Sequence, residues 1–203
     1  RIPAETLERL WTMLAHAQGT LLNASKLAAG LSVSAPTVTS YIDLLVDLLL
    51  VRRLRPCIAN TGKRLVKSPK ICVRDSGIVH ALLGIGDYNA LAGHPVVGAS
   101  WEGFVIETLL ANAPPRTTAG FYRTSAGAEI DIILELPGRH GTWAIEIKRG
   151  LGVAPSKGFH IARNDLRPAR SFVVYSGQAR YPLSEDVEAV GLPEMAGMLG
   201  DLS

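Results

Sequence analysis

The sequence predicts a mixed α/β (α+β) fold in two parts, namely helices followed by a basic β-hairpin, then an α/β part built on a sheet. Residues 4–50 carry apolar residues at the spacing of amphipathic helices. Residues 99–176 read in order as helix, three strands, helix and strand. A composition of 47% hydrophobic and 19% charged residues is ordinary for a globular chain with enough apolar material for a core.

Three helices are expected before residue 51. The first covers residues 4–16 and has one apolar face. A short second helix is expected at 25–29 and ends at Gly30. The third covers residues 35–50, and its core face is predicted to consist of Val38, Ile42, Leu45 and Leu49.

A β-hairpin is expected next, with strands at 51–58 and 64–73 and a turn at 60–62. Eight basic residues lie between Arg52 and Arg74 with no Asp or Glu among them, and such local positive charge attracts phosphate backbones. The order helix, short helix, helix, hairpin is that of a winged helix, with the hairpin as the wing. Six of these residues are predicted to contact DNA: Arg52, Arg53, Lys63, Arg64, Lys67 and Lys70.

Other interpretations of this part stay open. Lysines on an exposed hairpin also prevent edge-to-edge aggregation without any ligand. The first turn of the third helix carries hydroxyl groups but no Arg, Asn or Gln for bidentate base contacts. Any DNA would therefore be held through its backbone, and winged helices also serve as protein-docking modules.

The predicted domains are a winged helix at 1–74, a connector at 75–97 that begins with a short helix, and an α/β domain at 98–203. The most apolar run, 42–51, is too short to cross a membrane and contains two Asp residues. The two cysteines lack the spacing of a zinc site. We therefore expect a cytoplasmic protein with reduced thiols and no membrane partner.

The candidate site lies on a second hairpin, with strands expected at Glu129–Leu136 and Thr142–Lys148. Side chains alternate along a strand, so Glu146 and Lys148 share one face of the second strand. Asp131 on the first strand could join them. Two carboxylates are the smallest hard-oxygen set for Mg²⁺ (or Mn²⁺), and a Lys beside them can orient or deprotonate a metal-bound water.

Glu102 is the further candidate carboxylate. When residues 101–111 are wound as an ideal helix, Glu102 falls near the middle of the apolar arc. Burying a carboxylate without a partner is costly, so Glu102 needs either a metal ion or Lys148 beside it. The plainer alternative for the whole set is ordinary cross-strand pairing between charged residues on an exposed sheet face.

Several segments, taken together, resemble one known family. In chain order they read LLNASKLAAGLSVSAPTVTSYIDLL, NTGKRLVKSPKICVRDSGIVHALLG, HPVVGASWEGFVIETLL, FYRTSAGAEIDIIL and AIEIKRG. They resemble the C-terminal region of predicted AAA+-type ATPases of bacteria and archaea, known as domain of unknown function 4143. The resemblance covers nearly the whole chain, roughly residues 10–199.

The resemblance implies a winged helix followed by a PD-(D/E)xK restriction-endonuclease-like domain with an αβββαβ core. The residues that match the nuclease motif are Glu102, Asp131, Glu146 and Lys148. Glu129 is implied to be either a second ligand or an ion-pair partner of Arg123. The resemblance further implies that an ATPase module precedes Arg1 in the intact protein and binds ATP there, since this chain lacks a phosphate-binding loop.

Two functions follow as alternatives. The first is metal-dependent phosphodiester hydrolysis, with DNA as partner, Asp131, Glu146 and Lys148 as catalytic residues, and Glu102 completing the metal shell. The second is a catalytically inactive regulatory or protein-interaction domain of the ATPase, in which the same side chains form a structural ion-pair cluster. Either function allows an oligomer.

Overall fold

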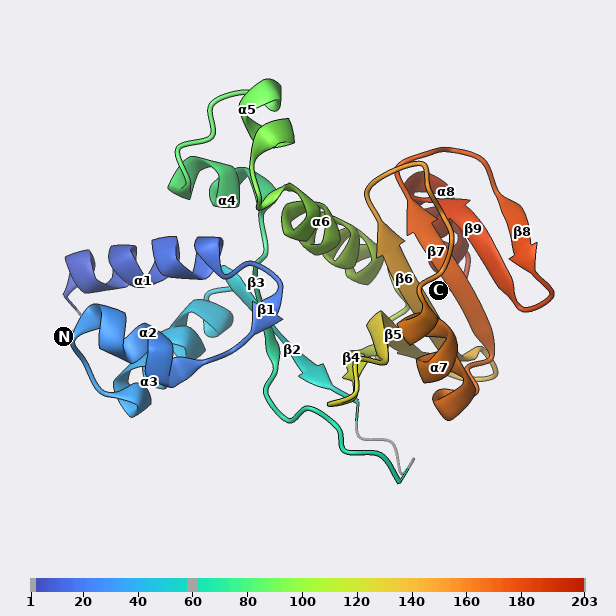
Figure 1. The fold of residues 1–203 in the computed structure, drawn as a ribbon, viewed down its shortest axis with the longest axis horizontal. Helices are drawn as coiled ribbons and strands as arrows, with labels where there is room; N and C mark the ends of the chain where they lie inside the picture. Colours follow the sequence, from blue (N-terminus) through green and yellow to red (C-terminus); the bar gives the residue numbers. More distant parts are fainter. Residues whose placement is uncertain (1–2, 58–61, 203) are drawn as a thin grey trace. The chain divides into compact units, whose positions relative to one another are not determined.

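The computed structural model describes residues 3–57 and 62–202 (Figure 1). Within them the chain forms a mixed α/β fold of eight helices and nine strands, as the sequence predicts in outline. The helices are α1 (Ala4–His16), α2 (Ala24–Leu31), α3 (Ala35–Asp47), α4 (Ser76–Leu82), α5 (Tyr88–Gly93), α6 (Val97–Asn112), α7 (Lys157–Leu166) and α8 (Leu192–Gly200). No helix in this described part is long and apolar enough to span a membrane.

The strands are β1 (Thr20–Leu21), β2 (Val51–Pro56), β3 (Lys70–Val73), β4 (Thr118–Arg123), β5 (Glu129–Leu136), β6 (Gly141–Lys148), β7 (Arg170–Tyr175), β8 (Tyr181–Ser184) and β9 (Val187–Gly191). Hydrogen bonds join them in the mixed order β1-β3-β2-β4-β5-β6-β7-β9-β8. The chain divides into two compact units. The first contains Arg1–Leu54 and Ser68–Phe104, and the second contains Arg55–Lys67 and Val105–Ser203.

The first unit packs α1, α2, α3 and α4 against the antiparallel strands β1, β3 and β2. Asn23 caps α2 by accepting a hydrogen bond from the Lys26 N–H (2.9 Å), and Ser34 caps α3 by accepting one from the Thr37 N–H (3.2 Å). The shared core includes Leu10, Leu14, Val38, Ile42, Leu45, Ile71 and Val73.

Helix ends in the first unit differ from the expected ones. Helix α2 continues through Gly30 and ends at Leu31, and the left-handed backbone of the following Ser32 (φ 56°) provides the turn instead. Helix α3 stops at Asp47, and Leu49, predicted to be buried, is 68% exposed in a left-handed turn (φ 59°). Helix α5 lies in the expected connector, because the Asp87 side chain caps it through the Ala90 N–H (2.9 Å).

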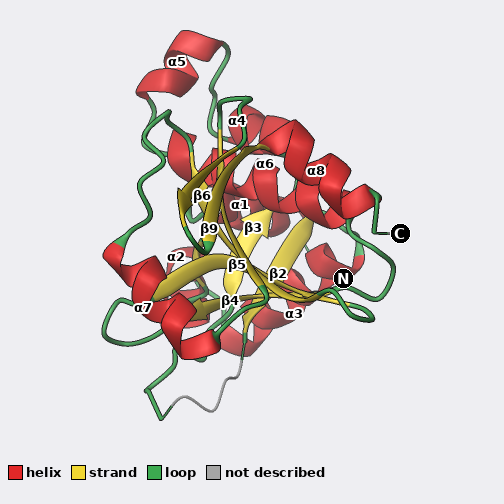
Figure 2. Cartoon of the chain, turned by 90° about the vertical axis from the view of Figure 1, so that its right-hand side faces the viewer, coloured by secondary structure: helices red, strands yellow, loops and turns green. Residues whose placement is uncertain are grey.

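The second unit is built on β4 to β9. The pairs β4–β5 and β5–β6 are antiparallel, whereas β6–β7 and β7–β9 are parallel. Helix α7 packs on β5, and α8 packs on β7 and β9 (Figure 2). Phe159 of α7 shares a buried cluster with Tyr122, Ile130, Ala144 and Val173 of the sheet.

The edges of this unit differ from the expected arrangement. The sheet also contains β9, which lies between β7 and β8, and the short β8, and neither is among the elements expected at residues 99–176. Residues 64–66 do not extend β3. They pair with the end of β4 through the Val66 N–H to Arg123 C=O and Ser125 N–H to Arg64 C=O bonds (both 2.9 Å), since Leu65 packs against the second unit's core. Residues 60–61 of the expected turn lie outside the described residues.

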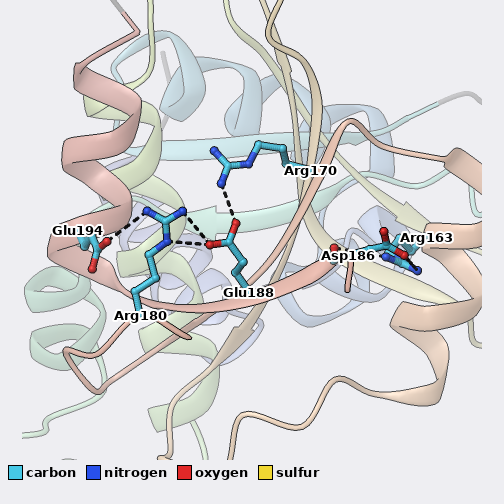
Figure 3. A network of polar contacts seen from close by, with 6 residues as sticks. All are labelled: Arg163, Arg170, Arg180, Asp186, Glu188 and Glu194. Carbon is cyan, nitrogen blue, oxygen red and sulfur yellow. Dashed lines mark hydrogen bonds and ion pairs between the residues drawn. The ribbon is translucent and has the colours of Figure 1, made fainter. Parts of the chain in front are cut away.

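A network of ion pairs ties β7, β9 and α8 together (Figure 3). Glu188 accepts hydrogen bonds from Arg170 and Arg180, each at 2.7 Å. Arg180 also reaches Glu194 of α8 at 3.4 Å. The Arg170 guanidinium in turn stacks over the Phe172 ring, 4.7 Å from its centroid.

Candidate functional site

The open end of the β5–β6 hairpin brings Asp131 beside Glu146. Ile132 pairs with Ile145, so one further step of this antiparallel register places Asp131 opposite Glu146. There the Asp131 Oδ2 accepts a hydrogen bond from the Ile147 N–H at 2.8 Å. The carboxylate of β5 thus lies against the backbone between Glu146 and Lys148.

Glu146 and Lys148 form an ion pair on β6. The Lys148 Nζ lies 2.7 Å from the Glu146 Oε1. The Glu146 side chain is only 7% exposed, whereas that of Lys148 is 30% exposed and reaches the surface. The predicted trio of Asp131, Glu146 and Lys148 therefore meets at one place, with the ammonium on its solvent side.

The N-terminus of α7 supplies a further contact to Glu146. The Ser156 N–H approaches both carboxylate oxygens, at 3.0 Å to Oε2 and 3.3 Å to Oε1. The Ser156 side chain in turn caps α7 by accepting from the Phe159 N–H (3.0 Å). Negative charge at a helix N-terminus is favourable, so the N-terminus of α7 is a suitable neighbour for the buried Glu146 side chain.

Close backbone packing fixes the position of that helix end. A Cβ on Gly158 would lie 2.8 Å from the Gly127 carbonyl oxygen, too close for any side chain. Gly158 therefore allows the first turn of α7 to approach the turn that leads into β5. Sequence reasoning missed Ser156 and Gly158, although the Ser-Lys-Gly-Phe start of a helix after Pro155 was a readable capping signal.

The donor set suits a hard divalent ion. Magnesium commonly takes one or two protein carboxylates, keeps several waters and bridges to substrate phosphate. Asp131 and Glu146 supply two such carboxylates on adjacent strands. Among the described residues, no group of three or more His, Cys, Asp and Glu residues is arranged to hold a metal. The fit is therefore to an ion with two protein carboxylates and otherwise water or phosphate ligands.

Glu102 has a partner that sequence reasoning did not consider. Its Oε1 accepts a hydrogen bond from the Lys70 Nζ at 2.9 Å, within the first unit. The Lys70 side chain is only 4% exposed, and that of Glu102 is 22% exposed. The expectation that Glu102 needs a counter-charge is therefore met by a lysine of β3.

The six predicted DNA contacts lie in different surroundings. Lys70 is buried against Glu102, and Arg53 pairs with Asp43 of α3. Arg52 is half-buried. The exposed members are Lys63, Arg64 and Lys67, which all belong to the second unit.

Lys63 is held by a pair of contacts that the sequence did not suggest. Its ammonium contacts both carboxylate oxygens of Asp165 on α7, at 2.7 and 2.8 Å. The Tyr122 hydroxyl donates to the same carboxylate at 2.9 Å. Nearby, Arg123 lies 3.6 Å from Glu129, which is the ion pair that the sequence offered as one alternative for Glu129.

A separate polar cleft of about 870 Å³ lies at the other end of β7. Its basic lining residues include Arg163 and Arg170, which pair with Asp186 (3.1 Å) and Glu188 (2.7 Å) respectively. Each of these two arginines thus has a carboxylate partner within the protein. We take the open end of β5 and β6, where two carboxylates meet a lysine, as the candidate site.

Two family descriptions match parts of the chain. Residues 1–89 match domain of unknown function DUF8612, and residues 97–195 match domain of unknown function DUF4143. The second family is the one that the sequence resembles, but its match covers the C-terminal half rather than nearly the whole chain. No solved structure matches the chain.

Two mycobacterial proteins are similar to the chain over most of its length. They are uncharacterized protein Rv2008c of Mycobacterium tuberculosis and uncharacterized protein Mb2031c of Mycobacterium bovis, each 47% identical over 190 residues. The match covers 94% of this chain but only 42% of each relative, so the chain spans less than half of their length. The chain thus carries a DUF8612 domain followed by a DUF4143 domain and is homologous to these two mycobacterial proteins.

Proposed function

We propose that the second unit is a PD-(D/E)xK nuclease-like domain that hydrolyses phosphodiester bonds with a divalent metal ion. One observation carries the proposal. The Asp131 carboxylate accepts the N–H of Ile147 (2.8 Å), the middle residue of the Glu146-Ile147-Lys148 segment. This contact sets the Asp beside the Glu-x-Lys segment, as the nuclease motif requires. The succession of α6, β4, β5, β6, α7 and β7 supports the αβββαβ core that accompanies the motif.

In this proposal each residue of the trio has one role. Asp131 and Glu146 hold Mg²⁺ or Mn²⁺, which when bound polarises a phosphoryl oxygen and lowers the pKa of a water. Lys148, on the exposed side of the trio, positions the attacking water and stabilises negative charge on the phosphate. The Ser156 N–H orients the Glu146 carboxylate. Glu102 remains part of the proposal because it matches the nuclease motif, although its observed contact is Lys70.

The first unit is proposed to be a winged helix that assists nucleic-acid binding. The element order α1, β1, α2, α3, β2, β3 and the strand order β1-β3-β2 support this assignment. The exposed cations Arg64 and Lys67, which belong to the second unit, are proposed to contact DNA through its phosphates.

We likewise propose that the intact protein is cytoplasmic and carries an ATPase module that uses ATP elsewhere in its chain. The relatives are longer than this chain, which leaves room for such a module.

Lys148→Ala tests the proposal directly. Metal-dependent nicking of plasmid or branched DNA should fall by at least about a hundredfold, because the charge that stabilises the phosphate is lost. The matched control is Arg139→Ala, which removes an exposed cation from the closed end of the same hairpin. Cleavage by Lys148→Ala at the wild-type rate would exclude Lys148 from catalysis.

A non-catalytic role is the second candidate, and the burial of Glu146 favours it specifically. A carboxylate that is 7% exposed, paired with Lys148 and hydrogen-bonded to the Ser156 N–H can serve to dock α7 on the sheet without any metal. In that case the domain would regulate the ATPase or bind a protein partner. Glu146→Gln would then lower the melting temperature while Asp131→Asn left every metal and DNA response unchanged.

A further inference from the structure

The segment that follows Lys148 is a short loop tied at both ends to Glu146. It comprises residues 149–156 and starts directly after the Lys148 that pairs with Glu146. It ends at Ser156, whose N–H approaches the Glu146 carboxylate at 3.0 Å. We call it the 149–156 loop. The 149–156 loop is therefore adjacent to the Asp131–Glu146–Lys148 trio.

An exposed leucine lies in the first half of this loop. Leu151 is 75% exposed, the largest exposed fraction among the large hydrophobic side chains of the described residues. Gly150 and Gly152 flank it, and a Cβ on Gly152 would meet nothing within 4 Å. Isolated surface leucines are common, but this one stands between two glycines next to the candidate site. Its position suits a contact with an apolar surface on a bound ligand.

Exposed cations stand at the two ends of the loop. Arg149 is exposed at its start, and Lys157 is exposed just after its end. Neither makes an ion pair with any residue that the structure describes. Lys157 occupies the first turn of α7, where a cation is unfavourable for the helix dipole, so helix stability does not account for it.

These features together fit a nucleic acid duplex. Arg and Lys side chains bind phosphates, and apolar wedges such as Leu insert between base steps and unstack them. Unstacking is least costly where a base pair is mismatched or the duplex is otherwise weakened. We propose that the 149–156 loop binds duplex nucleic acid at a weakened base step, with Leu151 as the wedge and Arg149 and Lys157 as phosphate contacts. This inference rests on the proposed function, because it names the substrate class of the same site.

The test is a binding measurement with the full chain in the absence of divalent ions, so that no cleavage intervenes. Fluorescence anisotropy would compare a labelled short duplex carrying one central mismatch with its fully paired counterpart. Wild type should prefer the mismatch by on the order of tenfold. Leu151→Ser should abolish that preference and leave the salt dependence unaltered, since it removes no charge.

The double variant Arg149→Gln/Lys157→Gln should weaken binding to both duplexes and reduce the slope of log K against log salt by about two, at about 0.9 per phosphate contact. The pair Arg139→Gln/Arg116→Gln is its control, because it makes the same charge change at two exposed arginines outside the loop. Equal losses in both double variants would show a net-charge effect and overturn the phosphate contacts.

Retained mismatch preference in Leu151→Ser, or no binding of either duplex by wild type, would overturn the inference. The same proteins tested for Mn²⁺-dependent cleavage keep the two proposals apart. Loop-dependent mismatch binding without cleavage would leave the inference standing and count against the nuclease. Cleavage that is lost in Lys148→Ala but unchanged in the loop variants would support the nuclease and count against the inference about the loop.

Discussion

Glu102 and Lys70 form an ion pair that is largely shielded from solvent. The Lys70 side chain is 4% exposed and its ammonium lies 2.9 Å from the Glu102 carboxylate. The attraction between two such charges roughly offsets the cost of removing them from water, whereas a single buried charge is strongly destabilising. The pair therefore adds little net stability, but removing either residue alone is costly.

Glu102→Gln should accordingly destabilise the protein by about 3 kcal/mol, because the buried Lys70 ammonium loses the carboxylate that it contacts. Urea unfolding of the variant and wild type measures the change. The double variant Lys70→Met/Glu102→Met should recover most of the loss. An unchanged urea midpoint of unfolding in Glu102→Gln would show that the buried Lys70 does not depend on Glu102 for stability.

Single residues were predictable from the sequence where local geometry fixes them. The two-residue period of a strand sets Glu146 and Lys148 on one face, and the hairpin brings Asp131 to them. The partners Lys70 and Ser156 could not be predicted in this way. Lys70 meets Glu102 across 32 residues of chain, and the Ser156 contact depends on where α7 docks.

Strand β9 holds its place through charges as well as hydrogen bonds. Although burial alone raises the pKa of Glu188, the hydrogen bonds and positive charges of Arg170 and Arg180 outweigh it, so the pKa lies below its ordinary value. The ionised carboxylate thus binds three elements together, since Arg180 also reaches Glu194 of α8. The network joins β7, β9 and α8 only while Glu188 stays charged (Figure 3).

Because its folded pKa is lowered, Glu188 contributes stability that is fully present above the unfolded pKa and is lost as pH falls through the folded pKa. Urea midpoints measured between about pH 7 and pH 3 should therefore decrease less steeply in Glu188→Gln than in wild type. Glu185→Gln, an exposed acid on the neighbouring turn, is the matched control. Parallel pH profiles for wild type and Glu188→Gln would contradict this account of the network.

At the scale of elements, the sequence predicted those with a strong period and missed those made by a cap or an edge. The bounds of α1 and β5 agree with the expected ones, because both carry a clear apolar pattern. Helix α5 has no buried residue and depends on the Asp87 cap. Strand β8 contains Pro182 and is mostly exposed, so no alternation marks it.

At the scale of the whole molecule, the two units do not follow the order of the sequence. Residues 55–67 belong to the second unit with residues 105–203, although the sequence placed them in an N-terminal wing. The reason is long-range pairing of Leu65 and its neighbours with the end of β4. The exposed cations Arg64 and Lys67 are consequently carried by the unit that contains the candidate site.

Metal binding by the second unit is the central claim, and calorimetric titration of the full chain with Mn²⁺ tests it most directly. We expect one site in wild type and its loss in Asp131→Ala/Glu146→Ala, because these two carboxylates are the proposed protein ligands. Glu135→Ala/Glu185→Ala, which removes two exposed acids elsewhere in the unit, should bind as wild type does. Wild-type binding retained in the Asp131→Ala/Glu146→Ala variant, or no binding by wild type, would contradict the proposed metal site.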